Sequence, residues 1–245
     1  MTTVPCPSLS GGGSQAGRVD RVLAIADPAL PSTSWESRGV KAFFSQSSSG
    51  PSDATAAGIL ASLPAGGVAH FACHAYADPG RPLHNAIILP GGDQLTVAEI
   101  LDASPPAGTT VILSACETGL AGPHVLDETI SLSAALLAAG CAGVLSTLWL
   151  VEDVSTALLM LKFYWEWRRE RHPAPLALAL AQHRQRTTTD RGKCSFAEDT
   201  LVGAGILDGT EGQALADRVR QGSGSPGGNS YAEPYYWAGF CFSGL

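Results

Sequence analysis

The chain has 245 residues, of which 45% are hydrophobic and 15% charged, a composition that supplies a core and excludes a largely disordered protein. Fifteen Lys and Arg against 22 Asp and Glu give a formal charge of −7 at pH 7. We therefore expect one α/β domain without the basic face that a nucleic-acid partner or an anionic membrane would require.

The N-terminal residues 1–18 are rich in Ser, Gly and Pro and contain neither the charged start nor the apolar core of a secretory signal. We expect a flexible segment there, followed by one domain over residues 19–245. The longest apolar region is interrupted by Ser and Gly and is too short to cross a membrane. The six cysteines are scattered along the chain, which favours reduced thiols in a cytoplasmic protein.

Short, continuous apolar runs predict buried β-strands, because they are too short for amphipathic helices. These runs occupy residues 21–27, 68–73, 86–89, 110–115 and 141–148. Helical spacing between and after them predicts helices at residues 53–63, 95–101, 126–139, 153–169 and 176–186. The alternation predicts an α/β fold, a three-layer sandwich with a mostly parallel central sheet and helices on both faces.

The C-terminal part of the chain gives a weaker pattern. Residues 186–229 combine mixed charges with a Gly- and Ser-rich stretch at 222–228, so we expect a flexible surface excursion with at most one short helix. The aromatic residues of 231–242, among them Tyr235, Tyr236, Trp237, Phe240 and Phe242, predict a last edge strand that packs back on the sheet.

Two predicted strands are directly followed by reactive residues. His74 follows the strand at 68–73, and Cys116 follows the strand at 110–115. If these strands are neighbours, about 4.8 Å apart, the imidazole and the thiol face the same crevice of the sheet. An adjacent imidazole favours the thiolate and can later protonate a leaving amine. The spacing alone leaves a second interpretation open, a buried structural cysteine and a hydrogen-bonded histidine.

Several motifs resemble, in the same order, the landmarks of the CHAT domains, caspase-like cysteine peptidases of the caspase, separase and gingipain group. They are HFACH at 70–74, LSACETG at 113–119, STLW at 146–149 and PYYWA at 234–238. The resemblance covers roughly residues 20–245. It implies a caspase-like sandwich and a cysteine endopeptidase, with a catalytic dyad of Cys116 and His74 and an oxyanion hole formed by the backbone amides of Ala75 and Cys116.

Two departures from the family pattern keep a second function open. CHAT domains usually have glycine after the dyad histidine, where this chain has Ala75, and they carry an opening segment that the Gly-rich start does not match. The alternative hypothesis is a catalytically inactive caspase-like scaffold or interaction module in a signalling or defence assembly.

Two acidic residues are candidates for substrate binding. By resemblance to separases, Asp153 would contact a basic residue ahead of the scissile bond, and Glu117 would add negative potential at the rim. The structural alternatives are that Asp153 caps the helix that follows it and that Glu117 is a solvated loop residue.

The expected partners are a protein substrate and, in addition, an activator or a repeat-domain protein. The site is expected to be latent until activated, and the arginine-rich stretch 184–191 is a candidate for self-cleavage. No metal or organic cofactor is implied. His70 and His74 would share one face of a strand while Cys73 points away from it, which is a poor arrangement for zinc.

Overall fold

The computed structural model describes residues 20–50, 54–76, 78, 80–114, 116–117, 132–222 and 227–244, with only the backbone described for Cys116 and Glu117. The segment at 1–18, which the sequence predicts to be flexible, lies outside these ranges.

A six-stranded sheet forms the centre of the molecule, with the strand order β10-β9-β7-β3-β1-β2. Within this sheet β10 is antiparallel to β9, and the other neighbours are parallel. The predicted α/β fold, its strands and the last edge strand are therefore confirmed. The strands are β1 (Arg21–Ala26), β2 (Gln46–Ser49), β3 (Val68–Ala72), β7 (Thr110–Leu113), β9 (Gly143–Thr147) and β10 (Phe240–Gly244).

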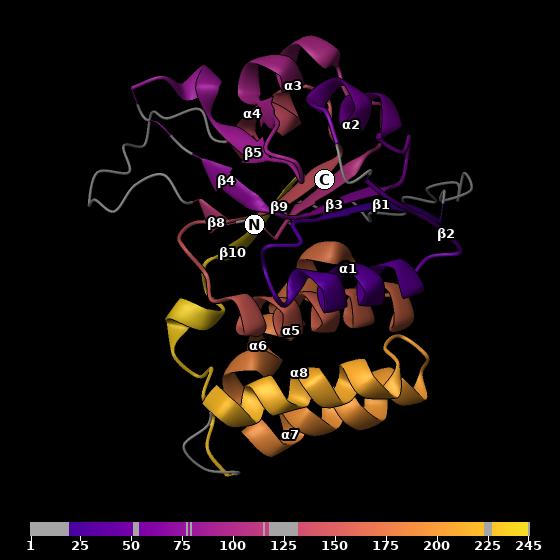
Figure 1. The fold of residues 1–245 in the computed structure, drawn as a ribbon, viewed down its shortest axis with the longest axis vertical. Helices are drawn as coiled ribbons and strands as arrows, with labels where there is room; N and C mark the ends of the chain where they lie inside the picture. The colour runs from indigo at the N-terminus through magenta and orange to yellow at the C-terminus, as the bar shows by residue number, and fades with distance from the viewer. Residues whose placement is uncertain are drawn as a thin grey trace, which may run out of the picture.

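Helices cover both faces of this sheet (Figure 1). One face carries α2 (Ala56–Ser62), α3 (Val97–Ala103) and α4 (Leu132–Ala138), and the other carries α1 (Thr33–Ala42), α5 (Asp153–Tyr164) and α6 (Ala174–Thr187). Successive strand residues point to opposite faces, so that in β1 Leu23 packs in the α2–α3–α4 cluster and Val22 in the opposite one. Burial on both faces explains why these strands read as continuous apolar runs.

A second, smaller sheet extends from the carboxyl ends of β3 and β7, with the order β6-β5-β4-β8. Its strands are β4 (His74–Tyr76), β5 (Ala86–Ile88), β6 (Gln94–Thr96) and β8 (Cys116–Glu117), and the short 3-10 helix η1 (Pro82–His84) precedes β5. The helix predicted at 95–101 begins two residues later, because Thr96 and Glu99 form a capping box at the start of α3.

The prediction for residues 186–229 is wrong for the residues that the structure describes. They form α7 (Asp190–Ser195), the π-helical segment η3 (Phe196–Leu201) and α8 (Gly209–Gly222), which add a fourth layer outside α5 (Figure 1). Leu201 and Leu215 of this layer are fully buried in one cluster with Leu158 of α5. The local pattern missed the layer because α7 and η3 are short, and because buried polar contacts mix with the apolar ones.

Because α5 lies between the sheet and this fourth layer, it is buried on all sides. Each residue from Val154 to Tyr164 is buried, as is typical of a helix in the centre of a domain. The helix predicted over 153–169 continues beyond α5 as the π-helical segment η2 (Trp165–Arg169). A last 3-10 helix, η4 (Pro234–Tyr236), leads into β10.

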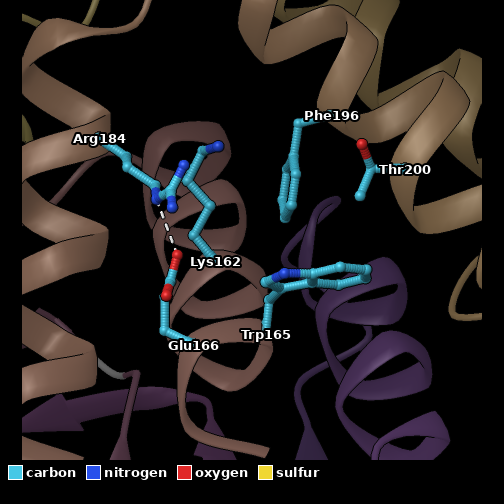
Figure 2. Close-up of a pocket in the computed structure, with 6 residues that line it drawn as sticks. All are labelled: Lys162, Trp165, Glu166, Arg184, Phe196 and Thr200. Atoms are coloured by element: carbon cyan, nitrogen blue, oxygen red, sulfur yellow. Dashed lines mark ion pairs between the residues drawn. The ribbon is translucent and has the colours of Figure 1, made fainter. Parts of the chain in front are cut away.

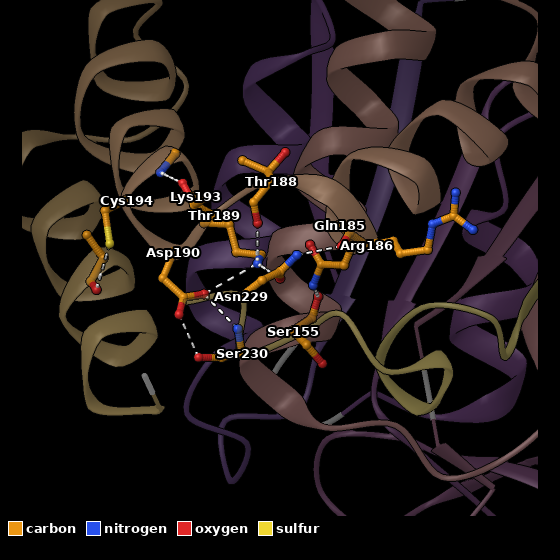
Figure 3. A network of polar contacts seen from close by, with 12 residues as sticks. Ser155, Gln185, Arg186, Thr188, Thr189, Asp190, Lys193, Cys194, Asn229 and Ser230 are labelled. Carbon is orange, nitrogen blue, oxygen red and sulfur yellow. Dashed lines mark hydrogen bonds and ion pairs between the residues drawn. The ribbon is translucent and has the colours of Figure 1, made fainter. Parts of the chain in front are cut away.

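A polar network joins the start of α7 to the chain just before η4 (Figure 3). The Asp190 carboxylate accepts hydrogen bonds from the backbone N–H and the hydroxyl of Ser230, at 2.9 and 2.8 Å. The buried Lys193 ammonium donates to the Thr188 carbonyl at 2.8 Å and to the Asn229 side chain. The network fixes the connection between α6 and α7.

This connection bears on the self-cleavage hypothesis for residues 184–191. The Arg184, Arg186 and Arg191 side chains are exposed, but the peptide bonds that follow them lie within α6 and α7. A helical peptide bond is held in backbone hydrogen bonds and is not extended across a protease cleft. The folded protein therefore does not offer this stretch as the exposed loop that the hypothesis requires.

Within the described ranges, none of the helices combines the length and the apolar character needed to span a bilayer.

Candidate active site

The carboxyl ends of β3 and β7 bring His74 and Cys116 to the same place. β3 and β7 are parallel neighbours, which is the condition that the sequence argument set, and β4 and β8 continue from them and pair with each other in parallel. In this register His74 lies directly opposite Cys116, and Ala75 opposite Glu117. Neighbouring strands are about 4.8 Å apart, so the two backbones bring an imidazole-bearing and a thiol-bearing residue next to each other. The side chains of Cys116 and Glu117 lie outside the described part of the structure.

His74 is held on both sides of its strand. It pairs with Ile88 of β5 in antiparallel register and with Cys116 of β8 in parallel register. Its side chain is half-buried, whereas its neighbours Cys73 and Ala75 are buried. The imidazole is therefore partly accessible, and both neighbouring strands hold the backbone that carries it.

Ala75 has no need of glycine at this position. It lies within β4, and its φ is not among the positive values of the described residues. An extended conformation is open to any L residue, so alanine fits the backbone at this position.

Cys73, the residue before His74, is chemically different from a nucleophile. It is fully buried, its thiol lies 3.7 Å from the Ile25 carbonyl, and burial raises its pKa to about 12. Cys141 is also buried, which raises its pKa to about 11. Both remain protonated thiols at neutral pH, because the thiolate is disfavoured in apolar surroundings.

Asp153 lies at the same edge of the sheet, after the carboxyl end of β9. Its Oδ2 accepts a hydrogen bond from the backbone N–H of Ser32, at 3.1 Å, and its side chain is half-buried. Ser32 directly precedes α1, so Asp153 ties the loop that follows β1 to the start of α5. Within the described residues, this contact uses one of the two carboxylate oxygens of Asp153.

The alternative prediction, that Asp153 caps α5, is wrong. The capping residue is Glu152, whose backbone is extended and whose carboxylate accepts from the N–H groups of Val154 and Ser155 at 3.1 and 2.7 Å. Glu152 has this role because its longer side chain folds back over the first turn and satisfies two free N–H groups. The Asp153 side chain is left to contact the α1 loop.

Sequence reasoning missed a buried polar group beneath this site. His70 of β3 is fully buried, with its Nε2 3.0 Å from Oε1 of Glu36 on α1 and its Nδ1 3.2 Å from the hydroxyl oxygen of Tyr164 on α5. Burial raises the pKa of Tyr164 well above its ordinary value, so its hydroxyl stays protonated. The partners are 34 and 94 residues from His70, and no local pattern could have identified them.

The described residues contain no group of three or more His, Cys, Asp or Glu side chains that could hold a metal ion. The sequence predicts His70 on the same strand face as His74. Both ring nitrogens of His70 already contact protein groups, Nε2 the Glu36 carboxylate and Nδ1 the Tyr164 hydroxyl.

Comparison with known proteins gives a family match and a match to solved structures. The model of the family described as CHAT domain matches residues 6–245. A solved structure described as the complex of Porphyromonas gingivalis RgpB pro- and mature domains has 10% sequence identity and a TM-score of 0.41. The match covers 87% of this chain and 48% of that one, so this chain spans about half the length of the solved chain. The search of curated proteins found no match.

Proposed function

The chain belongs to the CHAT domain family, and from this premise we propose that it is a cysteine endopeptidase with a dyad of Cys116 and His74. The observation that carries the proposal is the parallel register of β4 and β8, with His74 opposite Cys116 at the carboxyl edge of the sheet. Ligands of parallel α/β sheets bind at that edge. The buried thiols of Cys73 and Cys141 are protonated and enclosed, so neither competes with Cys116 as a nucleophile.

The chemistry follows from the two groups. His74 accepts the proton of the Cys116 thiol, and the thiolate attacks the carbonyl carbon of the scissile peptide bond. The C–N bond breaks as His74 returns the proton to the leaving amine, and water then hydrolyses the acyl-enzyme. By resemblance to the family, the backbone amides of Ala75 and Cys116 would stabilise the oxyanion. The backbone of Ala75 is extended and does not require glycine.

A thiol-reactive peptide probe tests the dyad. The wild-type protein should be labelled at Cys116, and Cys116→Ala and His74→Ala should both lose labelling and peptide cleavage. The matched control for the second variant is His84→Ala, because His84 is an exposed histidine on η1. Mapping the labelled peptide by mass excludes reaction at Cys241, a half-buried free thiol. Labelling that persists in Cys116→Ala, or its absence in an activated wild type, would favour the non-catalytic scaffold.

We further propose that the enzyme cuts after a basic residue, with Asp153 as the acidic group that binds it and Glu117 adding negative potential. The half-buried Asp153 carboxylate, which uses one oxygen to hold Ser32, supports this assignment. Fluorogenic peptides that end in Arg, Lys, Asp or Leu test it, and the Arg and Lys peptides should be cleaved fastest. Asp153→Asn should raise KM for the basic peptides and leave the Leu peptide unchanged. A preference for Asp would contradict the proposal.

The same enzyme is proposed to be latent until an activator or a repeat-domain partner binds it. Labelling of Cys116 by the probe should then be slow for the isolated protein and increase when the partner is added. Equal labelling with and without the partner would contradict latency without affecting the dyad.

A further inference from the structure

A small cavity lies between α5–η2, α6 and η3, away from the proposed dyad. Its volume is about 160 Å³, and it is lined by Lys162, Trp165, Glu166, Arg184, Phe196 and Thr200. Figure 2 shows Lys162 and Arg184 on one side of this cavity and Phe196 and Thr200 on the other. The volume corresponds to several water-sized spheres, which is room for an anion of four or five heavy atoms.

Lys162 is the unusual member of the lining. Its side chain is 4% exposed, and its ammonium lies 3.7 Å from the centroid of the Phe196 ring. Within the described residues its Nζ has no hydrogen-bond acceptor and no carboxylate within bonding distance. Buried cations in proteins are normally paired, because an unpaired one loses its hydration without compensation.

The carboxylate that lines the cavity, Glu166, is already paired with other side chains. Glu166 Oε1 accepts from the Arg184 guanidinium at 2.7 Å, and Glu166 Oε2 lies 3.6 Å from Nε2 of His172. Arg184 uses its Nε in this pair, so its terminal N–H groups can donate to a ligand. With Lys162 protonated, the lining carries one net positive charge.

We propose that this cavity binds a small oxyanion, a phosphate or carboxylate group on a free small molecule, with the Lys162 ammonium as its main ligand. The Arg184 guanidinium, which is more than half exposed, forms the entrance. The Phe196 and Trp165 rings form the apolar part of the lining, and an electrostatic contact is stronger beside apolar groups than in open water. The ligand would contact residues of α5, α6 and η3 at once.

This site is separate from the proposed dyad. Lys162 is nine residues from Asp153 along α5, a distance of about 14 Å at 1.5 Å per residue. Failure of the peptidase proposal therefore leaves the oxyanion site untouched.

The charge of Lys162 makes binding dependent on pH. Burial lowers its pKa to about 7, and the positive charges of Arg184 on α6 and Lys193 on α7 act in the same direction, while Glu166 on η2 opposes them. His172, between η2 and α6, faces the same carboxylate. Because the protonated amine binds the anion, affinity should fall by roughly twentyfold between pH 6.5 and pH 8.5.

Calorimetric titration with sodium sulfate and with sodium acetate, each against sodium chloride at equal ionic strength, tests the proposal. Neither probe changes its own charge in this pH range. Saturable binding of sulfate indicates a phosphate-type ligand, and saturable binding of acetate indicates a carboxylate. Heat that does not exceed the chloride control for either probe overturns the proposal. Calorimetry is preferred to thermal unfolding, because sulfate stabilises folded proteins without binding to a site.

The variants Lys162→Met and Lys41→Met form a matched pair, because both remove one lysine charge and Lys41 lies at the end of α1. Lys162→Met should weaken binding at least tenfold, and Lys41→Met should leave it unchanged. Equal binding by both variants overturns the proposal. If Lys162→Met does not fold, the pH series on the wild type decides, and an affinity that is constant from pH 6.5 to 8.5 overturns the assignment of Lys162.

Discussion

The two faces of the central sheet are packed by different chemistry. On the face covered by α2, α3 and α4, the described core consists of aliphatic, aromatic and thiol side chains. On the face covered by α1, α5 and α6, and in the layer beyond it, the core also encloses acidic and basic side chains. These buried residues are Glu36, His70, Lys162, Glu166, Asp190, Lys193 and Glu211.

This difference predicts where the stability of the protein should depend on pH and on single substitutions. Apolar burial is independent of pH, whereas a buried charge changes its free energy whenever its partner or its proton is lost. Both faces contribute to one sheet and therefore to one unfolding transition. The sensitivity to charge should nevertheless be confined to the face that α1, α5 and α6 cover.

The largest effect is expected when the His70–Glu36 pair is broken. His70→Leu leaves the Glu36 carboxylate buried without its partner and removes the group that contacts the Tyr164 hydroxyl. We expect a loss of about 3–5 kcal/mol in the free energy of unfolding. Unfolding by guanidinium chloride at pH 7 measures it.

The double variant His70→Leu/Glu36→Met distinguishes two causes of the lower stability, the unpaired Glu36 charge and the changed packing at position 70. Replacing both partners of a buried pair by apolar groups is often neutral, so the double variant should recover more than half of the loss. A double variant that is less stable than His70→Leu would contradict a role for the uncompensated charge.

Removal of the Lys162 amine should raise the free energy of unfolding, whereas His70→Leu should lower it. The unfolded chain keeps this amine protonated up to its ordinary value of 10.5, whereas the folded protein releases the proton near pH 7. The cost of burying the charge is therefore fully present below pH 7, and stability rises with pH above it. We expect Lys162→Met to be more stable than the wild type at pH 6.5, by about 2 kcal/mol or more.

The same variant should change the pH dependence. In the wild type the Lys162 amine adds a slope of up to about 1.4 kcal/mol per pH unit above pH 7, and Lys162→Met should lack it. Unfolding measured in chloride buffers from pH 6.5 to 8.5 gives both slopes. Parallel curves for the two proteins would show that the amine is not protonated differently in the folded state.

A substitution on the other face provides the comparison. Ile59 of α2 is fully buried in the apolar cluster, and Ile59→Val removes one methylene group. We expect a loss of about 0.5–1.5 kcal/mol in the free energy of unfolding. The loss should be the same at pH 6.5 and at pH 8.5, and a difference between these values would break the proposed division of the two faces.

The smallest effect is expected for an exposed ion pair. Arg220 of α8 donates to both Glu198 oxygens on η3, at 2.6 and 2.8 Å, and its side chain is nearly half exposed. Glu198→Gln should cost about 0.2–1 kcal/mol, and the cost should disappear in roughly 1 M sodium chloride. A cost that persists at high salt would show that solvent does not screen this pair, as is typical of buried charges.

Part of this molecule could be predicted from local sequence. The runs at 21–27, 68–73 and 110–115 predicted β1, β3 and β7, because a strand buried on both faces needs an uninterrupted apolar segment. Their parallel direction was predicted from the helices between them, and the ends of two strands identified His74 and Cys116 as candidates, whereas the adjacency of β3 and β7 came from the structure. These properties depend on neighbours within a few residues.

The tertiary structure alone decided the rest. The choice of Glu152 over Asp153 as the cap of α5 depends on the Ser32 backbone, which takes the Asp153 carboxylate. The layer of α7, η3 and α8 is stable because α5 buries its apolar side and Ser230 holds Asp190. Contacts between residues distant in the chain have no periodicity along it, so neither composition nor spacing contains them.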